Sequence, residues 1–180
     1  MQEPPSILVV DDEPNNFDAI EALLCSEGYA LNYASNGRRA LEQLHLFKPD
    51  VILLDVMMPD LDGIEVCRLI KAQPEWQAVP IVMVTALTDK ADLAHCLAAG
   101  ASDFISKPVN GLEMRARVAA MLRIKRQHDE LEMLLALREI ANERRYASLA
   151  AAAPVGIFRT DLAGRCIYVN QRWSEMTGVD

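Results

Sequence analysis

The sequence lacks any run of about 18 consecutive apolar residues, so it contains no segment suited to crossing a membrane as a helix. Its first residues, Met1–Ser6, have no basic group and no long apolar stretch, and they do not resemble a secretory signal. These two absences predict a cytoplasmic protein.

Cysteine is also scarce. The four cysteines, Cys25, Cys67, Cys96 and Cys166, include no CxxC pair, which argues against a zinc site or a disulfide framework. We expect buried or half-buried free thiols instead. His95 and Cys166 are interpreted as structural residues.

Basic charge is deficient in the first two thirds of the chain. The net charge is −8, and residues 1–120 contain 18 acidic and 9 basic residues, whereas residues 121–180 contain 8 and 9. An acidic domain followed by a segment of mixed charge is poorly suited to the phosphates of nucleic acid. We therefore expect no direct binding to nucleic acid.

Hydrophobic residues make up 51% of the chain, enough for a substantial core. Five short apolar runs alternate with stretches of helical periodicity, which predicts a (βα)5 order. Strands that are apolar on both faces indicate a parallel sheet covered on two sides, a flavodoxin-like, doubly wound α/β fold. The expected strands are 7–10, 29–34, 51–54, 81–84 and 102–106.

The last helix is predicted to be unusually long, because residues 112–153 contain neither proline nor glycine. About 40 helical residues would span roughly 60 Å. Five apolar residues in its middle form a stripe without a clean heptad register, so either a coiled coil or packing on a neighbouring domain is open. The stripe consists of Leu131, Leu134, Leu135, Leu137 and Ile140.

Pro154 is expected to end this helix. Residues 156–161 and 165–170, with a turn at Leu162-Ala163-Gly164, have the pattern of a β-hairpin, and a helical turn is expected around Trp173. The 27 residues from 154 to 180 are too few to bury a core by themselves.

The carboxyl ends of the predicted strands gather the polar residues best suited to chemistry, as is usual for open parallel sheets. Asp11, Asp12 and Asp55 end two strands that should be neighbours. Three crowded carboxylates suit a hard cation such as Mg²⁺. Each Asp alone would more often be a turn or helix cap.

Asp55 is also a plausible nucleophile toward a phosphoryl group, whose charge a metal would neutralise. Lys107 adds a positive charge for the phosphoryl oxygens, and Thr85 adds a hydroxyl donor. A lone lysine is usually solvated, but together these residues on one sheet edge indicate phosphate chemistry.

Residues 6–125 resemble the receiver domain of two-component response regulators. The resemblance rests on four segments in a specific order and spacing, which are Val9–Pro14, Leu54–Pro59 with Asp62-Gly63, Thr85-Ala86, and Lys107-Pro108.

The resemblance implies that Asp55 takes a phosphoryl group from a phosphohistidine on a histidine kinase or phosphotransfer protein. It implies a Mg²⁺ site formed by Asp11, Asp12, Asp55 and the backbone carbonyl of Met57. Contacts to the phosphoryl group and the switch are implied for Thr85, Ala86, Lys107 and the aromatic Phe104, and a cis peptide is implied at Pro108. Phe104 could instead be a static core aromatic. Receivers of this family commonly form homodimers through the fourth and fifth helices.

Residues from Ala153 to Gly178 resemble the opening of a PAS sensor domain, on the segments 153–158, 170–173 and 176–178. The expected organisation is a receiver at 1–125, a linker helix at 126–153, and an N-terminal PAS fragment at 154–180. The chain resembles one cut inside its second domain, so a kinase or cyclase output could follow. The linker helix and the unpaired hairpin also favour a homodimer.

Two other functions fit the sequence less well. An aspartate-nucleophile hydrolase of the haloacid dehalogenase kind needs a second Asp two residues after the nucleophile, where this chain has Met57. A scaffold without phosphorylation would not need all of the site residues. His128-Asp129-Glu130-Leu131 faintly resembles the phosphorylated histidine motif of sensor kinases but lacks the following Arg and Pro, so a solvated helical histidine is expected. We therefore expect a phosphoacceptor regulatory domain rather than an enzyme.

Overall fold

The computed structural model of the chain describes residues 4–86 and 90–178. These residues form two compact units, one ending at Asp129 and the other beginning at Glu130. Among the described helices, none combines the length and apolar character that a membrane crossing requires.

The first unit is built on one parallel sheet of five strands in the order β2-β1-β3-β4-β5. This arrangement confirms the predicted flavodoxin-like fold. The central strands are buried on both faces, which explains why their sequences are continuous apolar runs. The strands are β1 (Ser6–Val10), β2 (Ala30–Ala34), β3 (Val51–Asp55), β4 (Ile81–Thr85) and β5 (Asp103–Ser106).

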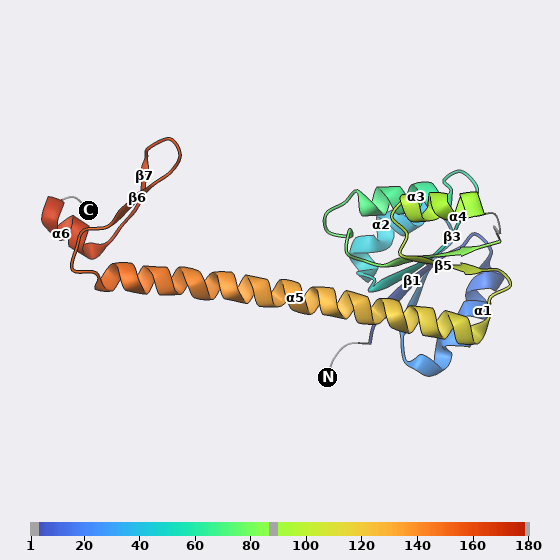
Figure 1. Ribbon diagram of the computed structural model, residues 1–180. Coiled ribbons are helices and arrows are strands. Elements are labelled where there is room, and N and C mark those ends of the chain that lie inside the picture. The colour runs from blue at the N-terminus through green and yellow to red at the C-terminus, as the bar shows by residue number, and fades with distance from the viewer. Residues whose placement is uncertain (1–3, 87–89, 179–180) are drawn as a thin grey trace. The chain divides into compact units, whose positions relative to one another are not determined.

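Helices cover both faces of the sheet (Figure 1). The helices α2, α3 and α4 lie on one face, and α1 and the start of α5 lie on the other. Each face has its own cluster of buried side chains, so the sheet separates two cores. The helices are α1 (Pro14–Leu24), α2 (Gly37–Phe47), α3 (Gly63–Lys71), α4 (Lys90–Ala98) and α5 (Gly111–Ala152), and the 3-10 turn η1 (Cys25–Glu27) follows α1.

Only the first turns of α5 belong to the core of the first unit. Its buried residues are Met114, Val118, Met121 and Leu122. Further along, the apolar side chains are about half exposed or more, including Leu131 at 57% and Leu135 at 55%. The predicted long helix is therefore present, and its apolar stripe lies open to solvent.

The second unit contains the end of α5, a hairpin and the short helix α6 (Gln171–Thr177). The hairpin strands β6 (Phe158–Thr160) and β7 (Cys166–Val169) pair antiparallel, as expected. The buried Asn170 caps α6 by accepting from the amide of Trp173 at 3.0 Å. Its side-chain amide donates to the carbonyls of Ala150, at 2.7 Å, and Val155, at 3.0 Å. One side chain thus joins the end of α5 to the hairpin and α6.

The cysteines follow the expectation only in part. Cys67 and Cys96 are buried free thiols, whereas Cys25 and Cys166 are exposed. The prediction of buried or half-buried thiols was wrong for Cys25 because α1 ends at Leu24 and η1 turns the residue outward. It was wrong for Cys166 because this residue lies at the exposed start of β7, in a hairpin of only two strands.

Gly63 places α3 directly against the end of β3. A Cβ atom at this position would lie 2.0 Å from the backbone oxygen of Asp55 and 2.8 Å from the Cα of Val56. Such contacts with backbone cannot be relieved by rotating a side chain. Only glycine permits this approach of helix and strand.

We predict that Gly63→Ala destabilises the protein by about 3 kcal/mol or more, because the loop after Asp55 must move to relieve the backbone clash. Gly28→Ala is the control: its φ of +72° strains an alanine, but nothing lies within 4 Å of the new Cβ. We expect it to cost only about 1–2 kcal/mol. Urea denaturation followed by circular dichroism measures both, and equal losses would contradict the proposed clash.

Candidate functional site

The carboxyl edge of the sheet gathers the site residues because parallel strands all end there. In the register of β1 and β3, Val10 pairs with Leu54, so Asp11 and Asp55 follow as neighbours at the strand ends. On the other side of β3, Thr85 ends β4 and pairs with Ser106 of β5. The next residue, Lys107, donates its backbone N–H to the carbonyl of Thr85 at 2.8 Å.

Asp11 is held rigidly, with only 1% of its surface exposed. One carboxylate oxygen, Oδ1, accepts from the backbone N–H of Glu13 and from Asn16 Nδ2, both at 2.9 Å. The other oxygen, Oδ2, accepts from Lys107 Nζ at 3.1 Å. Tyr33 on β2 donates its hydroxyl to the backbone carbonyl of Asp11 at 2.9 Å, which anchors the strand end as well.

Asp55 shares the same lysine. Its Oδ2 accepts from Lys107 Nζ at 2.9 Å, and its Oδ1 accepts from the backbone N–H of Met57 at 3.3 Å. The ammonium group of Lys107 therefore bridges two carboxylates whose residues are 1% and 5% exposed. The bridge brings together residues that lie 96 and 52 positions apart in the sequence.

Burial and charge act in opposite directions on these groups. Burial raises the pKa of Asp55, and the hydrogen bond and positive charge of Lys107 only partly offset this effect. For Lys107, burial acts to lower the pKa, but hydrogen bonds to Asp55 and Asp11 outweigh it and the pKa is raised. Both pKa values are thus raised, which favours the neutral acid of Asp55 and the charged ammonium of Lys107. Burial dominates at Asp55, whose side chain is 6% exposed, and is outweighed at Lys107, whose side chain is 24% exposed. The cluster therefore stabilises the ammonium form of Lys107, whereas the carboxylate form of Asp55 carries a desolvation cost.

The donor set fits a hard divalent cation. Asp11, Asp12 and Asp55 each offer a carboxylate oxygen, and these oxygens lie within 4.8 Å of one another. Carboxylates supplemented by water are the ligands that Mg²⁺ prefers. Lys107 supplies only one positive charge beside them, which is too little to neutralise three carboxylates.

The remaining predicted residues lie around this cluster. Thr85 is fully buried and Ala86 is exposed at the end of β4. The Lys107–Pro108 peptide is cis. Met57 is exposed in the loop after Asp55, and Phe104 is partly buried on β5, packed against the core under α3 and α4.

Sequence reasoning missed Asn16, which donates to both oxygens of Asp11, at 2.9 and 3.1 Å. Its position in the first turn of α1, which begins two residues after the acidic pair Asp11-Asp12, was the available signal. It also missed Tyr33, whose contact depends on the pairing of β1 with β2 and has no local signature.

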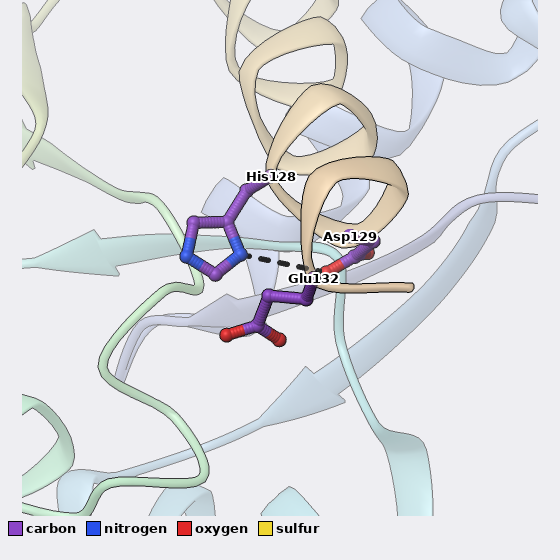
Figure 2. A group of neighbouring side chains, drawn as sticks. All are labelled: His128, Asp129 and Glu132. Carbon is purple, nitrogen blue, oxygen red and sulfur yellow. Dashed lines mark ion pairs between the residues drawn. The ribbon is translucent and has the colours of Figure 1, made fainter. Parts of the chain in front are cut away.

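A second acidic group lies on α5. Figure 2 shows His128, Asp129 and Glu132 as neighbours on this helix, with an ion pair between His128 Nδ1 and Asp129 Oδ1 at 3.9 Å. Asp129 is also paired with Lys125 at 2.5 Å, so its charge already has a cation beside it. These exposed side chains fit the predicted solvated helix surface better than a metal site.

Comparison with known proteins adds two family matches. A family model described as the response regulator receiver domain matches residues 7–119, and one described as a PAS domain matches residues 144–180. Response regulator PleD of Caulobacter vibrioides is 40% identical over 177 residues, which cover 97% of this chain and 37% of PleD. The chain thus spans little more than a third of that relative.

Solved structures resemble the first unit. A protein described as a response regulator from Chloroflexus aurantiacus has a TM-score of 0.65 at 32% identity and covers 67% of this chain and 99% of its own. The receiver domain of sensor histidine kinase PA1611 from Pseudomonas aeruginosa has a TM-score of 0.62 at 34% identity, with coverages of 67% and 98%. That structure contains a magnesium ion coordinated in its active-site cleft.

We predict that Asp55→Asn stabilises the metal-free protein by about 1 kcal/mol at pH 7, because it removes a desolvated negative charge. The pKa of Asp55 is raised above its ordinary value of 3.8, so the folded state binds this proton more tightly and stability falls as pH rises through the raised pKa. The gain in the variant should therefore vanish as the pH is lowered toward 3.8.

Thermal unfolding in the presence of a chelator, between pH 4 and 8, measures this difference. Asp18→Asn removes an exposed carboxylate from α1 and serves as the charge-matched control. A gain in Asp55→Asn that grows at low pH, or that equals the control at every pH, would contradict the assignment.

Proposed function

The chain belongs to the response regulator receiver domain family, and we propose that it transfers a phosphoryl group from a phosphohistidine to Asp55 in a phosphorelay. The donor would be a histidine kinase or a phosphotransfer protein. The observation that carries this proposal is the lysine bridge. Lys107 lies 2.9 Å from Asp55 and 3.1 Å from Asp11, at a strand edge that also presents Asp12.

The chemistry follows from these side chains. A carboxylate oxygen of Asp55 attacks phosphorus, the bond from phosphorus to the histidine nitrogen breaks, and the imidazole leaves with that electron pair. Asp11, Asp12, Asp55 and the backbone carbonyl of Met57 would hold Mg²⁺. When bound, this ion neutralises charge on the transferring oxygens. Asn16 fixes the orientation of the Asp11 carboxylate.

After transfer, Lys107 and the hydroxyl of Thr85 would bind phosphoryl oxygens, with Ala86 beside them. Lys107 must then exchange a carboxylate oxygen for a phosphoryl oxygen, which favours a rearranged edge at β4 and β5. Phe104, one residue before Ile105 on β5, is the proposed switch aromatic. The resulting change would reach an output through α5.

We extend the proposal to the organisation of the chain. Receiver, linker helix and PAS fragment would occupy residues 1–125, 126–153 and 154–180, and the receiver would act as a regulatory phosphoacceptor in the cytoplasm. A kinase or cyclase output in a longer protein is compatible with this role. The net acidity of residues 1–120 supports a receiver that makes no direct contact with nucleic acid.

A homodimer through α4, α5 and the linker part of α5 is also proposed. Leu131, Leu134, Leu135, Leu137 and Ile140 are each about half exposed or more. Each such side chain is worth roughly 1.5–3 kcal/mol when fully buried, so a second copy would be stabilising. Two-fold pairing is the simplest closed arrangement.

The central test is phosphorylation with acetyl phosphate, a small-molecule phosphoryl donor, in the presence of Mg²⁺. The intact mass should rise by one phosphoryl group, and a chelator should abolish the increase. Asp55→Asn should take up no phosphoryl group, whereas the control Asp18→Asn should behave as wild type.

Other outcomes have clear meanings. Labelling that persists in Asp55→Asn would reject Asp55 as the acceptor. Continuous release of many phosphates per protein would favour a hydrolase, and no uptake at all would favour a scaffold.

Self-association is tested by the paired substitution of Leu131 and Leu135 with Gln. Both side chains are more than half exposed, so the fold should persist, and the dissociation constant of the dimer should rise at least about tenfold. The control replaces Leu46 and Leu69, exposed leucines of α2 and α3, with Gln. Analytical ultracentrifugation of the full chain decides, and a monomeric wild type at tens of micromolar would reject the dimer.

A further inference from the structure

Arg117 on α5 makes an unusual set of contacts at the edge strand β5. Its guanidinium pairs with Asp103 on β5 at 2.5 Å and with Glu113, one turn earlier on α5, at 2.8 Å. The same group lies over the ring of Phe104, with Cζ 6.0 Å from the ring centroid. One side chain therefore contacts two consecutive residues of β5 and its own helix.

These contacts fix the position of the guanidinium group, which is therefore not a freely solvated surface charge. Its side chain is 34% exposed, and hydrogen bonds to Asp103 and Glu113 raise the pKa of Arg117, so the positive charge is permanent. The planar group can pair with carboxylates at its edge while its charge faces an aromatic ring. A lysine could provide the charge but not this combined geometry.

Phe104 lies on the edge strand β5, next to residues of both core clusters. Its ring packs against the core cluster on the side of α2, α3 and α4, while Ile105, the next residue, belongs to the cluster beneath α1 and α5. Phe104 pairs with Met83 in the ladder of β4 and β5, two residues before Thr85 pairs with Ser106. Because β5 is the edge strand, the Phe104 side chain can be reached from α5 around the open edge.

We propose that Arg117 is a positioning residue that holds the Phe104 ring in place and transmits movement of that ring to α5. The holding role is a property of the unphosphorylated protein and stands on the contacts above. The transmitting role rests on the proposed function, since phosphorylation of Asp55 supplies the movement.

The transmission has a simple physical basis. If Phe104 changes rotamer, Arg117 either loses its ring contact or follows the ring and loosens its pairs with Asp103 and Glu113. Loosening either pair would affect α5, because Glu113 and Arg117 lie on consecutive turns at the start of that helix. Met114 and Val118, buried on the neighbouring positions, would carry the adjustment into the core.

The holding role is tested by fluorine NMR of the full chain labelled with 4-fluorophenylalanine. The four phenylalanines give four signals, and Phe104→Tyr identifies the one that belongs to Phe104. In unphosphorylated Arg117→Gln the Phe104 signal should move or broaden, with the ratio of released to held ring rising roughly fivefold, equivalent to about 1 kcal/mol. Arg117→Lys should give an intermediate effect.

Matched controls separate the ring contact from charge and stability. Arg115→Gln removes the same charge from the same helix, but Arg115 contacts the carbonyl of Leu23 instead, at 3.2 Å. Its Phe104 signal should equal wild type. Asp103→Asn weakens the ion pair and leaves Arg117 in place, and it should release the ring less than Arg117→Gln. An unchanged Phe104 signal in Arg117→Gln, or equal effects in Arg117→Gln and Arg115→Gln, would overturn the holding role.

The transmitting role is tested by hydrogen–deuterium exchange of residues 111–122, before and after treatment with acetyl phosphate and Mg²⁺. Wild type and Arg117→Gln should take up phosphate equally, because Arg117 is absent from the carboxylate cluster. The exchange change in α5 should be at least halved in Arg117→Gln. An equal change in both proteins would overturn transmission. If neither protein takes up phosphate, the proposed function fails and transmission fails with it, while the NMR comparison still decides the holding role.

Discussion

The rest of the site depends on one electrostatic constraint, which is that the buried carboxylates of Asp11 and Asp55 must coexist with little water, beside the partly buried Asp12. Lys107 relieves this by bridging Asp55 and Asp11 at 2.9 and 3.1 Å. The bridge spans the sheet from β1 across β3 and β4 to the end of β5, so the positions of four strands determine it. A single ammonium leaves excess negative charge, and this excess makes the cluster suitable for a divalent cation.

The same constraint connects the site to the outer strand. Lys107 follows β5 directly and hydrogen-bonds through its backbone to Thr85, so a change in the partners of its ammonium acts on β4 and β5 together. Phe104 and Asp103 lie on that strand, and Arg117 joins both to α5. The charge cluster, the edge strand and the helix therefore form a continuous set of contacts within the first unit.

Much of this architecture could be predicted from local patterns. The strands were recognisable because burial on both faces requires uninterrupted apolar runs such as Val51–Leu54, and the acids were recognisable because they follow such runs. Contacts made across the fold had no such signature. Tyr33 supports Asp11 only once β2 has paired with β1, and the pairing of Arg117 with Asp103 depends on how α5 crosses the edge strand. The exposure of Cys25 likewise depended on where α1 ends, which apolar periodicity locates poorly.

The claim that Lys107 and a divalent cation compete for one carboxylate cluster is tested most directly by the Mg²⁺ dissociation constant in Lys107→Ala. Removing a positive charge about 3 Å from two of the carboxylates should tighten Mg²⁺ binding roughly tenfold relative to wild type. Isothermal titration calorimetry of the full chain provides the measurement, with Asp55→Asn as the variant that should bind more weakly. Tighter binding in Lys107→Ala is the predicted result, and an affinity equal to or weaker than wild type would contradict the account.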